Sequence, residues 1–262
     1  MGRRRTKKNL LKKAVRYGGS FGLLVVSIVF CLHTVQSSAF VSQDQSPLAQ
    51  LSHVSIPEIP ARAVALVQAA PADAKISVIT NALWAVSGLA RPGVMPYVIN
   101  ALCRANPQLA DVVVGTAAEI DNTPIVTIIC AAKAGAPDMI EKMAVAAFRG
   151  NPEAMRDTAL TLVTQTTLTS TNIFNDLGEA LPNLEPFVDM ARIQADQTMV
   201  DQSSVTITNA EAREVSLILG YTMYAITNSG QTLDEVLTND ASGANDESPL
   251  ITTNNPTPAP AP

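Results

Sequence analysis

The chain has 262 residues, of which 47% are hydrophobic and only 4% aromatic, and it carries 18 basic and 23 acidic residues. This length is sufficient for one domain with a buried core. Three cysteines, one of them in the N-terminal apolar run, are too few for a disulfide-stabilised scaffold.

The first 39 residues have the three parts of a secretory signal peptide. Eight basic residues precede position 17, an apolar run follows at 21–32, and the small residues at 37–39 suit a cleavage site. We predict cleavage between Ala39 and Phe40, and therefore export to the periplasm or the extracellular space. The alternative is an uncleaved inner-membrane anchor formed by residues 21–39, although this apolar run is short for a membrane span.

Cleavage would change the charge balance strongly. It would leave ten basic residues against 23 acidic ones, a net charge of about −13. Such a surface repels phosphate groups, so nucleic acid is excluded as a partner, and a membrane is expected as one only if the N-terminal segment is retained. Residues 40–59 have no clear pattern and are predicted to form a flexible linker.

A four-residue stretch near position 150 has a near-copy 45 residues upstream. It reads Arg149-Gly150-Asn151-Pro152. Arg149 suits the negative end of one helix, and Gly150 suits a C-terminal cap with positive φ. Asn151 can cap the next helix, and Pro152 can occupy its first turn without losing a hydrogen bond. The stretch therefore predicts a corner between two antiparallel helices.

Corners of this kind recur along the chain. The upstream copy contributes Arg104, Asn106 and Pro107, and further corners are predicted at Thr123 with Pro124 and, without a side-chain cap, at Pro137. Successive prolines from position 92 to 152 are 15, 17, 13 and 15 residues apart. Apolar residues between them follow helical spacing. The sequence therefore predicts short helices in units of about 15 residues.

The fold class expected from these units is all-α. We predict one domain at residues 60–238, with repeats at about 60–165 and capping helices at about 172–238, because a single unit buries too little apolar surface to be stable alone. The stack can be an open solenoid or a curled bundle. Capping boxes at Thr208 with Glu211 and at Thr232 with Glu235 mark the last two helices, the first at 209–226. Residues 239–262, rich in Pro, Thr and Asn, are predicted to be a disordered tail.

The alanine-rich helices and the two Asn-Pro corners resemble a known kind of sequence. The stretches at 104–107 and 149–152, with the helices between them, are similar to the proline-punctuated helical repeats of uncharacterised exported proteins from Verrucomicrobia-like bacteria. This resemblance covers about residues 60–165. It implies export and helical stacking, and it supplies no site residues.

Residues suited to catalysis or cofactor binding are scarce. Downstream of the predicted signal the sole histidine is His53, which we expect in a loop, so we predict no catalytic, cofactor or metal site and no cofactor. Carboxylate pairs such as Asp138 with Glu141 are ordinary at helix starts, although a carboxylate-based hydrolase would need one. Cys103 and Cys130 are interpreted as small buried hydrophobes, with a disulfide between neighbouring helices as the alternative.

The function expected from these features is non-catalytic. We predict a helical-repeat scaffold or protein-binding module of the bacterial envelope, whose partner is an envelope protein or a second copy of the chain. The first alternative is a carrier of an apolar small molecule or lipid, and the second is the carboxylate-based hydrolase. Repeat stacking favours the scaffold because it makes an extended binding face.

Overall fold

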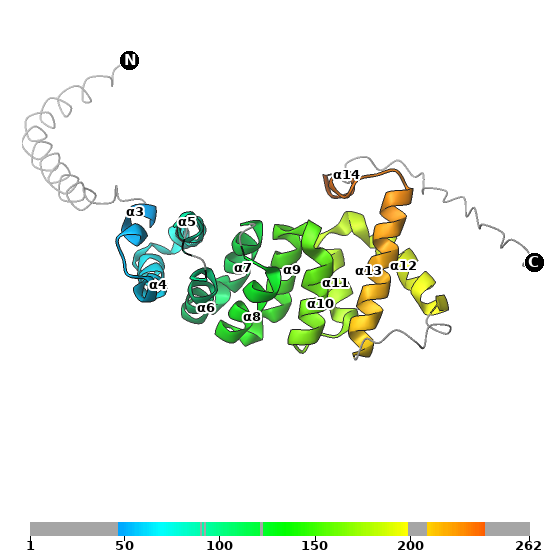
Figure 1. Cartoon of the computed structure of the whole chain (residues 1–262), viewed down its shortest axis with the longest axis horizontal. Coiled ribbons are helices and arrows are strands. Elements are labelled where there is room, and N and C mark those ends of the chain that lie inside the picture. Colours follow the sequence, from blue (N-terminus) through cyan, green and yellow to red (C-terminus); the bar gives the residue numbers. More distant parts are fainter. Residues whose placement is uncertain (1–46, 90, 92, 121–122, 199–208, 239–262) are drawn as a thin grey trace, which may run out of the picture.

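The computed structural model describes residues 47–89, 91, 93–120, 123–198 and 209–238 (Figure 1). Within these ranges every regular element is a helix, so the all-α prediction is confirmed. The predicted cleavage site between Ala39 and Phe40, the candidate membrane anchor and the predicted disordered tail lie outside the described residues.

The helices form two layers, and consecutive helices alternate between them. The first layer contains α3 (Pro47–Ser52), α5 (Lys75–Gly88), α7 (Ala110–Glu119), α9 (Ile140–Gly150) and α11 (Ser170–Ala180). The second contains α4 (Ile59–Ala69), α6 (Met95–Ala105), α8 (Ile125–Gly135), α10 (Met155–Gln165) and, at its end, α13 (Ala210–Asn228). Each helix packs on the helix two positions earlier, for example α9 on α7 and α8 on α6, and Figure 1 shows the resulting elongated stack.

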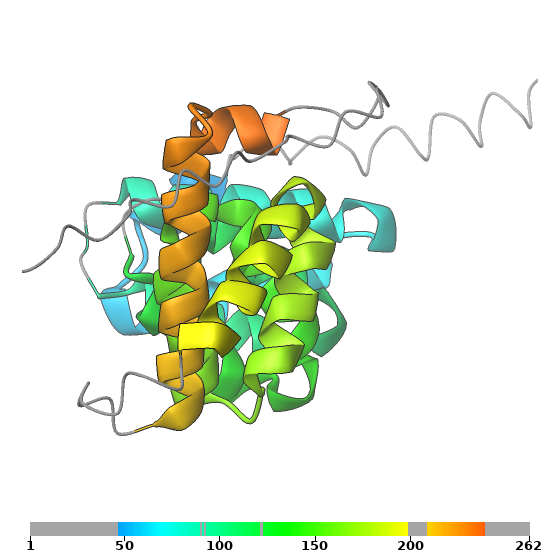
Figure 2. The same cartoon turned by 90° about the vertical axis from the view of Figure 1, so that its right-hand side faces the viewer.

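The C-terminal end of the stack is arranged differently. The long helix α13 lies against α10, and α12 (Glu185–Thr198) packs on α13 at the end of the stack (Figure 2). The short helix α14 (Leu233–Thr238) follows, and its predicted capping box is confirmed: Thr232 and Glu235 each accept a hydrogen bond from the other's backbone nitrogen. Longer helices thus close the stack, as predicted.

The helices repeat every 15 residues. Seven successive helices begin at regular intervals, at Met95, Ala110, Ile125, Ile140, Met155, Ser170 and Glu185. This confirms the unit length but corrects the expected end of the repeats near residue 165. The period continues through Ser170, where the corner contains no proline. The Thr169 side chain begins the helix there by accepting a hydrogen bond from the backbone nitrogen of Asn172.

The predicted corners hold in part. Asn151 caps as expected, because its Oδ1 accepts a hydrogen bond from the backbone nitrogen of Ala154 at 3.1 Å. Pro107, Pro137 and Pro152 each begin a short 3-10 turn, of residues 107–109, 137–139 and 152–154, which leads into the next α-helix.

Two predicted caps are wrong. The side chain of Asn106 makes no cap, and its buried Nδ2 has no hydrogen-bond partner within the described structure. Pro124 itself occupies the N-cap position of α8, so Thr123 lies one residue too early to cap that helix. An Asn-Pro or Thr-Pro pair therefore does not fix the side-chain hydrogen bond on its own.

The role predicted for Gly150 is also wrong. Among the described glycines the positive φ angles belong to Gly93 and Gly230, whereas Gly150 is the last residue of α9. A Cβ on Gly150 would lie 2.4 Å from the backbone oxygen of Gly115 in α7. Glycine is required here because the two helices approach too closely for any side chain.

The predicted linker is too long. Helix α3 and a 3-10 turn at Ile56–Glu58 lie within residues 40–59, and the Leu51 side chain is completely buried. Residues 47–59 therefore belong to the folded domain and cover its N-terminal end. His53 is exposed in the turn after α3, in agreement with the prediction of a loop.

Candidate functional site

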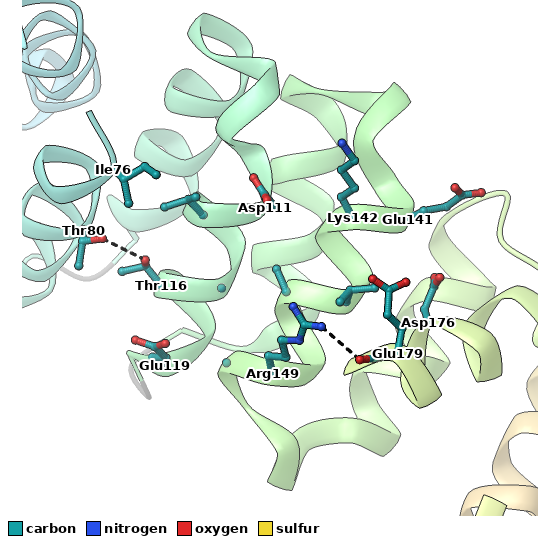
Figure 3. A pocket seen from close by; sticks show the side chains of 15 residues that line it. Ile76, Thr80, Asp111, Thr116, Glu119, Glu141, Lys142, Arg149, Asp176 and Glu179 are labelled. Carbon is teal, nitrogen blue, oxygen red and sulfur yellow. Dashed lines mark hydrogen bonds between the residues drawn. The ribbon is translucent and has the colours of Figure 1, made fainter. Parts of the chain in front are cut away.

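A large hollow lies on the outer face of the first layer. It has a volume of about 850 Å³, and residues of α5, α7, α9 and α11 line it (Figure 3). The buried side chains of the same helices, such as Val113 and Met143, belong to the hydrophobic core instead. We call this hollow the outer groove.

Small residues bring the helices of the outer groove close together. Gly115 of α7 lies against Ala146 of α9, where an added Cβ would be 3.5 Å from the alanine Cβ. Towards α5, Thr116 is buried and its hydroxyl lies 3.5 Å from the hydroxyl of Thr80. This close packing makes a floor of small side chains, with the longer charged side chains around it.

Three charged residues at one end of the outer groove occupy the same position in three neighbouring helices of the first layer. Glu119, Arg149 and Glu179 are each 30 residues apart and lie in the last turns of α7, α9 and α11. All three are exposed, and in Figure 3 Arg149 lies between the two carboxylates. We call these residues the charge triplet, whose signs alternate as negative, positive and negative along the stack.

The other end of the outer groove has an excess of acid. Asp111 and Glu141 line it together with one cation, Lys142, and Asp176 lies beside Glu179 (Figure 3). The Oδ1 of Asp111 and the Oδ2 of Asp176 are buried and have no hydrogen-bond partner within the described structure. Burial, and to a smaller extent the negative charges of Glu141 and Glu179, raises the pKa of Asp176 to about 6. The outer groove therefore holds carboxylate oxygens that lack donors.

The predicted corner residues contribute to the site in an unexpected way. Arg149 and Gly150 line the outer groove, whereas Asn151 and Pro152 lie just beyond its edge, beside a smaller hollow. Sequence reasoning missed Glu119 and Glu179 as site residues. The signal that could have found them is their 30-residue spacing from Arg149, which is two repeat units.

The carboxylates considered for a hydrolase lie on the surface. Asp138 and Glu141 are both exposed, and Glu141 also lines the outer groove. Within the described ranges, no three acidic, histidine or cysteine side chains are arranged to hold a metal ion. None of the described helices combines the length and the apolar character that a membrane crossing requires.

The two cysteines lie on neighbouring helices of the second layer. Cys103 on α6 is buried and Cys130 on α8 is half-buried, and both are free thiols, so the alternative of a disulfide is not realised in this structure. Burial raises the pKa of the Cys103 thiol to about 12. This thiol is consistent with a small buried hydrophobe.

The fold and the outer groove define the class of this protein as a two-layered α-helical repeat protein with a charged groove on one layer. No family model, curated protein or solved structure matches the chain.

Proposed function

We propose that this protein is an exported, non-catalytic scaffold of the bacterial envelope that holds a partner protein in the outer groove. The observation that carries the proposal is the groove itself, which is continuous over four helices of one layer. In a stack, such a face presents equivalent positions at regular intervals, as extended binding surfaces of helical-repeat proteins do.

The chemistry of the groove supports a macromolecular partner rather than a reaction. Five acidic side chains and two basic ones line it, and no histidine or cysteine is among them. The floor consists of small side chains and does not enclose a deep apolar cavity, which a carrier of lipid would need. The excess of acid disfavours nucleic acid, because phosphate groups would be repelled.

Photo-crosslinking in the envelope tests this proposal. A benzoylphenylalanine in place of Lys142 would lie exposed in the groove, and the same residue in place of Tyr97 is a matched control on α6, in the second layer. Tyr97 is 70% exposed, so access of the probe is not limiting there. Mass spectrometry then identifies each adduct.

We expect a defined protein adduct, an envelope protein or a second copy of the chain, from position 142 and none from position 97. Equal adducts from both positions, or none from either, would contradict the scaffold. An adduct of lipid mass at position 142 would favour the carrier of an apolar molecule and would also overturn the proposal.

A further inference from the structure

The charge triplet has the geometry of a one-dimensional recognition pattern. Glu119, Arg149 and Glu179 are equivalent residues of three helices that run parallel within one layer. Packed helices are about 8–10 Å apart, so the three charges should follow each other at about that spacing along the stack. A segment lying across the helices would meet one charge of the triplet per helix.

An extended polypeptide has a matching period. In the polyproline II conformation the chain rises about 3.1 Å per residue with three residues per turn, so every third side chain points the same way at intervals of about 9 Å. Such a segment can present one side chain to each helix of the first layer. A β-strand fits less well, since its side chains alternate with a period of two.

We propose that the outer groove binds an extended protein segment that runs along the stack and places a basic, an acidic and a basic side chain, three residues apart, against Glu119, Arg149 and Glu179. This inference rests on the proposed function and specifies the chemistry of the partner. The pattern in the partner is Lys/Arg-x-x-Asp/Glu-x-x-Lys/Arg, with proline compatible at the intervening positions.

The acidic side chains of the outer groove support a cationic occupant. The partnerless oxygens of Asp111 and Asp176 are buried, and leaving such atoms without donors is costly. Donors from a lysine or arginine of the bound segment would satisfy them. Two acids flanking the single cation of the triplet also give the whole groove a negative excess, which matches a segment with more basic than acidic residues.

The chain's own ends do not fit this pattern. Residues 239–262 contain acidic residues but no lysine or arginine, so they would be repelled by the groove. Residues 3–16 are basic but contain no acidic residue to face Arg149. The occupant we propose is therefore a different protein.

Binding of a designed peptide to the full chain tests the inference. The probe is a fluorescent peptide with the sequence Ala-Lys-Pro-Pro-Glu-Pro-Pro-Lys-Ala. Its binding is measured by fluorescence anisotropy. The control, Ala-Pro-Lys-Glu-Lys-Pro-Pro-Pro-Ala, has the same composition and charge but the wrong spacing. We expect the first peptide to bind about tenfold more tightly than the control. This difference corresponds to two exposed charge pairs that the control cannot form because its charges have the wrong spacing.

Two variants locate the binding. Glu119→Gln removes one exposed carboxylate and should weaken the first peptide several-fold without affecting the fold. Arg149→Glu should reverse the preference, so that Ala-Lys-Pro-Pro-Lys-Pro-Pro-Lys-Ala becomes the better ligand. Because Arg149 also donates a hydrogen bond to α11, circular dichroism of this variant must show an intact fold, and Glu119→Gln remains informative if it does not.

Equal affinity for the two peptides of matched composition would overturn the inference, as would binding that is unchanged by Glu119→Gln. Spermidine competing as well as the matched peptide would also overturn it, since the groove would then recognise charge without register. Failure of these tests is distinguishable from failure of the proposed function, because cross-linking at position 142 does not depend on the peptide sequence.

Discussion

Arg149, in the last turn of α9, donates a hydrogen bond from Nη2 to the backbone oxygen of Glu179 at the end of α11, at 3.1 Å. The second layer has the same contact: Lys133 of α8 donates from Nζ to the backbone oxygen of Gln165 at the end of α10. Each cation thus satisfies a terminal carbonyl of the helix two positions later, where the helix dipole also favours positive charge. These contacts link the repeats along the stack.

The corner at Asn151 gives a first prediction. Replacing Asn151 by alanine should lower the free energy of unfolding by about 1 kcal/mol, because the backbone nitrogen of Ala154 loses its hydrogen bond to the Asn151 side chain. Pro152→Ala should have a smaller effect, since that proline replaces no hydrogen bond. Asn106→Ala is the matched control, because the Asn106 side chain makes no cap. Urea denaturation measures all three, and a larger loss for Pro152→Ala than for Asn151→Ala would contradict the corner.

A second prediction concerns close helix approach. Gly150→Ala should destabilise the protein by about 1–3 kcal/mol, because the added Cβ would collide with the backbone oxygen of Gly115. Gly178→Ala should instead stabilise it by about 0.5–1 kcal/mol, since Gly178 lies within α11 with open space around it and alanine favours a helix. Thermal unfolding compares the two variants. Similar shifts of Tm in the same direction would show that the helices do not pack as closely as described.

A third prediction concerns Asp176, whose pKa is raised from 3.8 to about 6 by burial and then by Glu141 and Glu179. Between these two pH values the folded state holds a proton that the unfolded state does not. The contribution of Asp176 to stability is therefore present below pH 4 and is lost as the pH rises through 6. Since the side chain is only half-buried, the effect is screened by solvent and amounts to about 1 kcal/mol.

Asp176→Asn should accordingly raise the free energy of unfolding at pH 8 and have little effect at pH 4. Chemical denaturation at both pH values measures this difference. Asp138→Asn, at an exposed position, is the control for the removal of one acidic charge. If Asp176→Asn destabilises the protein at pH 8, the carboxylate has a donor that the structure does not contain.

A fourth prediction concerns the two thiols of the second layer. Iodoacetamide at pH 8 should label Cys130 first, because Cys103 is buried and its pKa of about 12 leaves almost no thiolate. Labelling of Cys103 should require unfolding of the protein. Mass spectrometry of tryptic peptides separates the two sites, and the variant Cys130→Ser should lose the fast reaction. Isolation of a peptide with Cys103 joined to Cys130 would show instead that the protein forms the disulfide.

The sequence predicted the repeat because prolines and helix caps act locally. Pro107, Pro137 and Pro152 restrict the backbone whatever lies around them, so their spacing indicated the unit length. The spacing was lost after residue 165 because Thr169 replaces a proline with a side-chain cap there. The corner at Pro182, which precedes α12, keeps the 15-residue interval but follows a leucine, so no capping residue indicated it.

The outer groove could not be predicted in the same way, because it depends on contacts between repeats. Gly150 was interpreted through its own backbone, whereas its role is set by Gly115, which lies 35 residues earlier in α7. Asp176 shows no local sign of its raised pKa, which arises from burial and from Glu141 on a neighbouring helix. Once the layers are known, the 30-residue spacing of charged residues becomes informative.

The most direct test of the account is competition between the designed peptide and the natural partner. Envelopes that contain the chain with benzoylphenylalanine at position 142 would be irradiated with the Lys-Pro-Pro-Glu-Pro-Pro-Lys peptide or with its control of altered spacing, and the adduct quantified by mass spectrometry. The account predicts that the correctly spaced peptide suppresses the partner adduct and that the control does not. A partner adduct that persists undiminished while the peptide occupies the groove would contradict it.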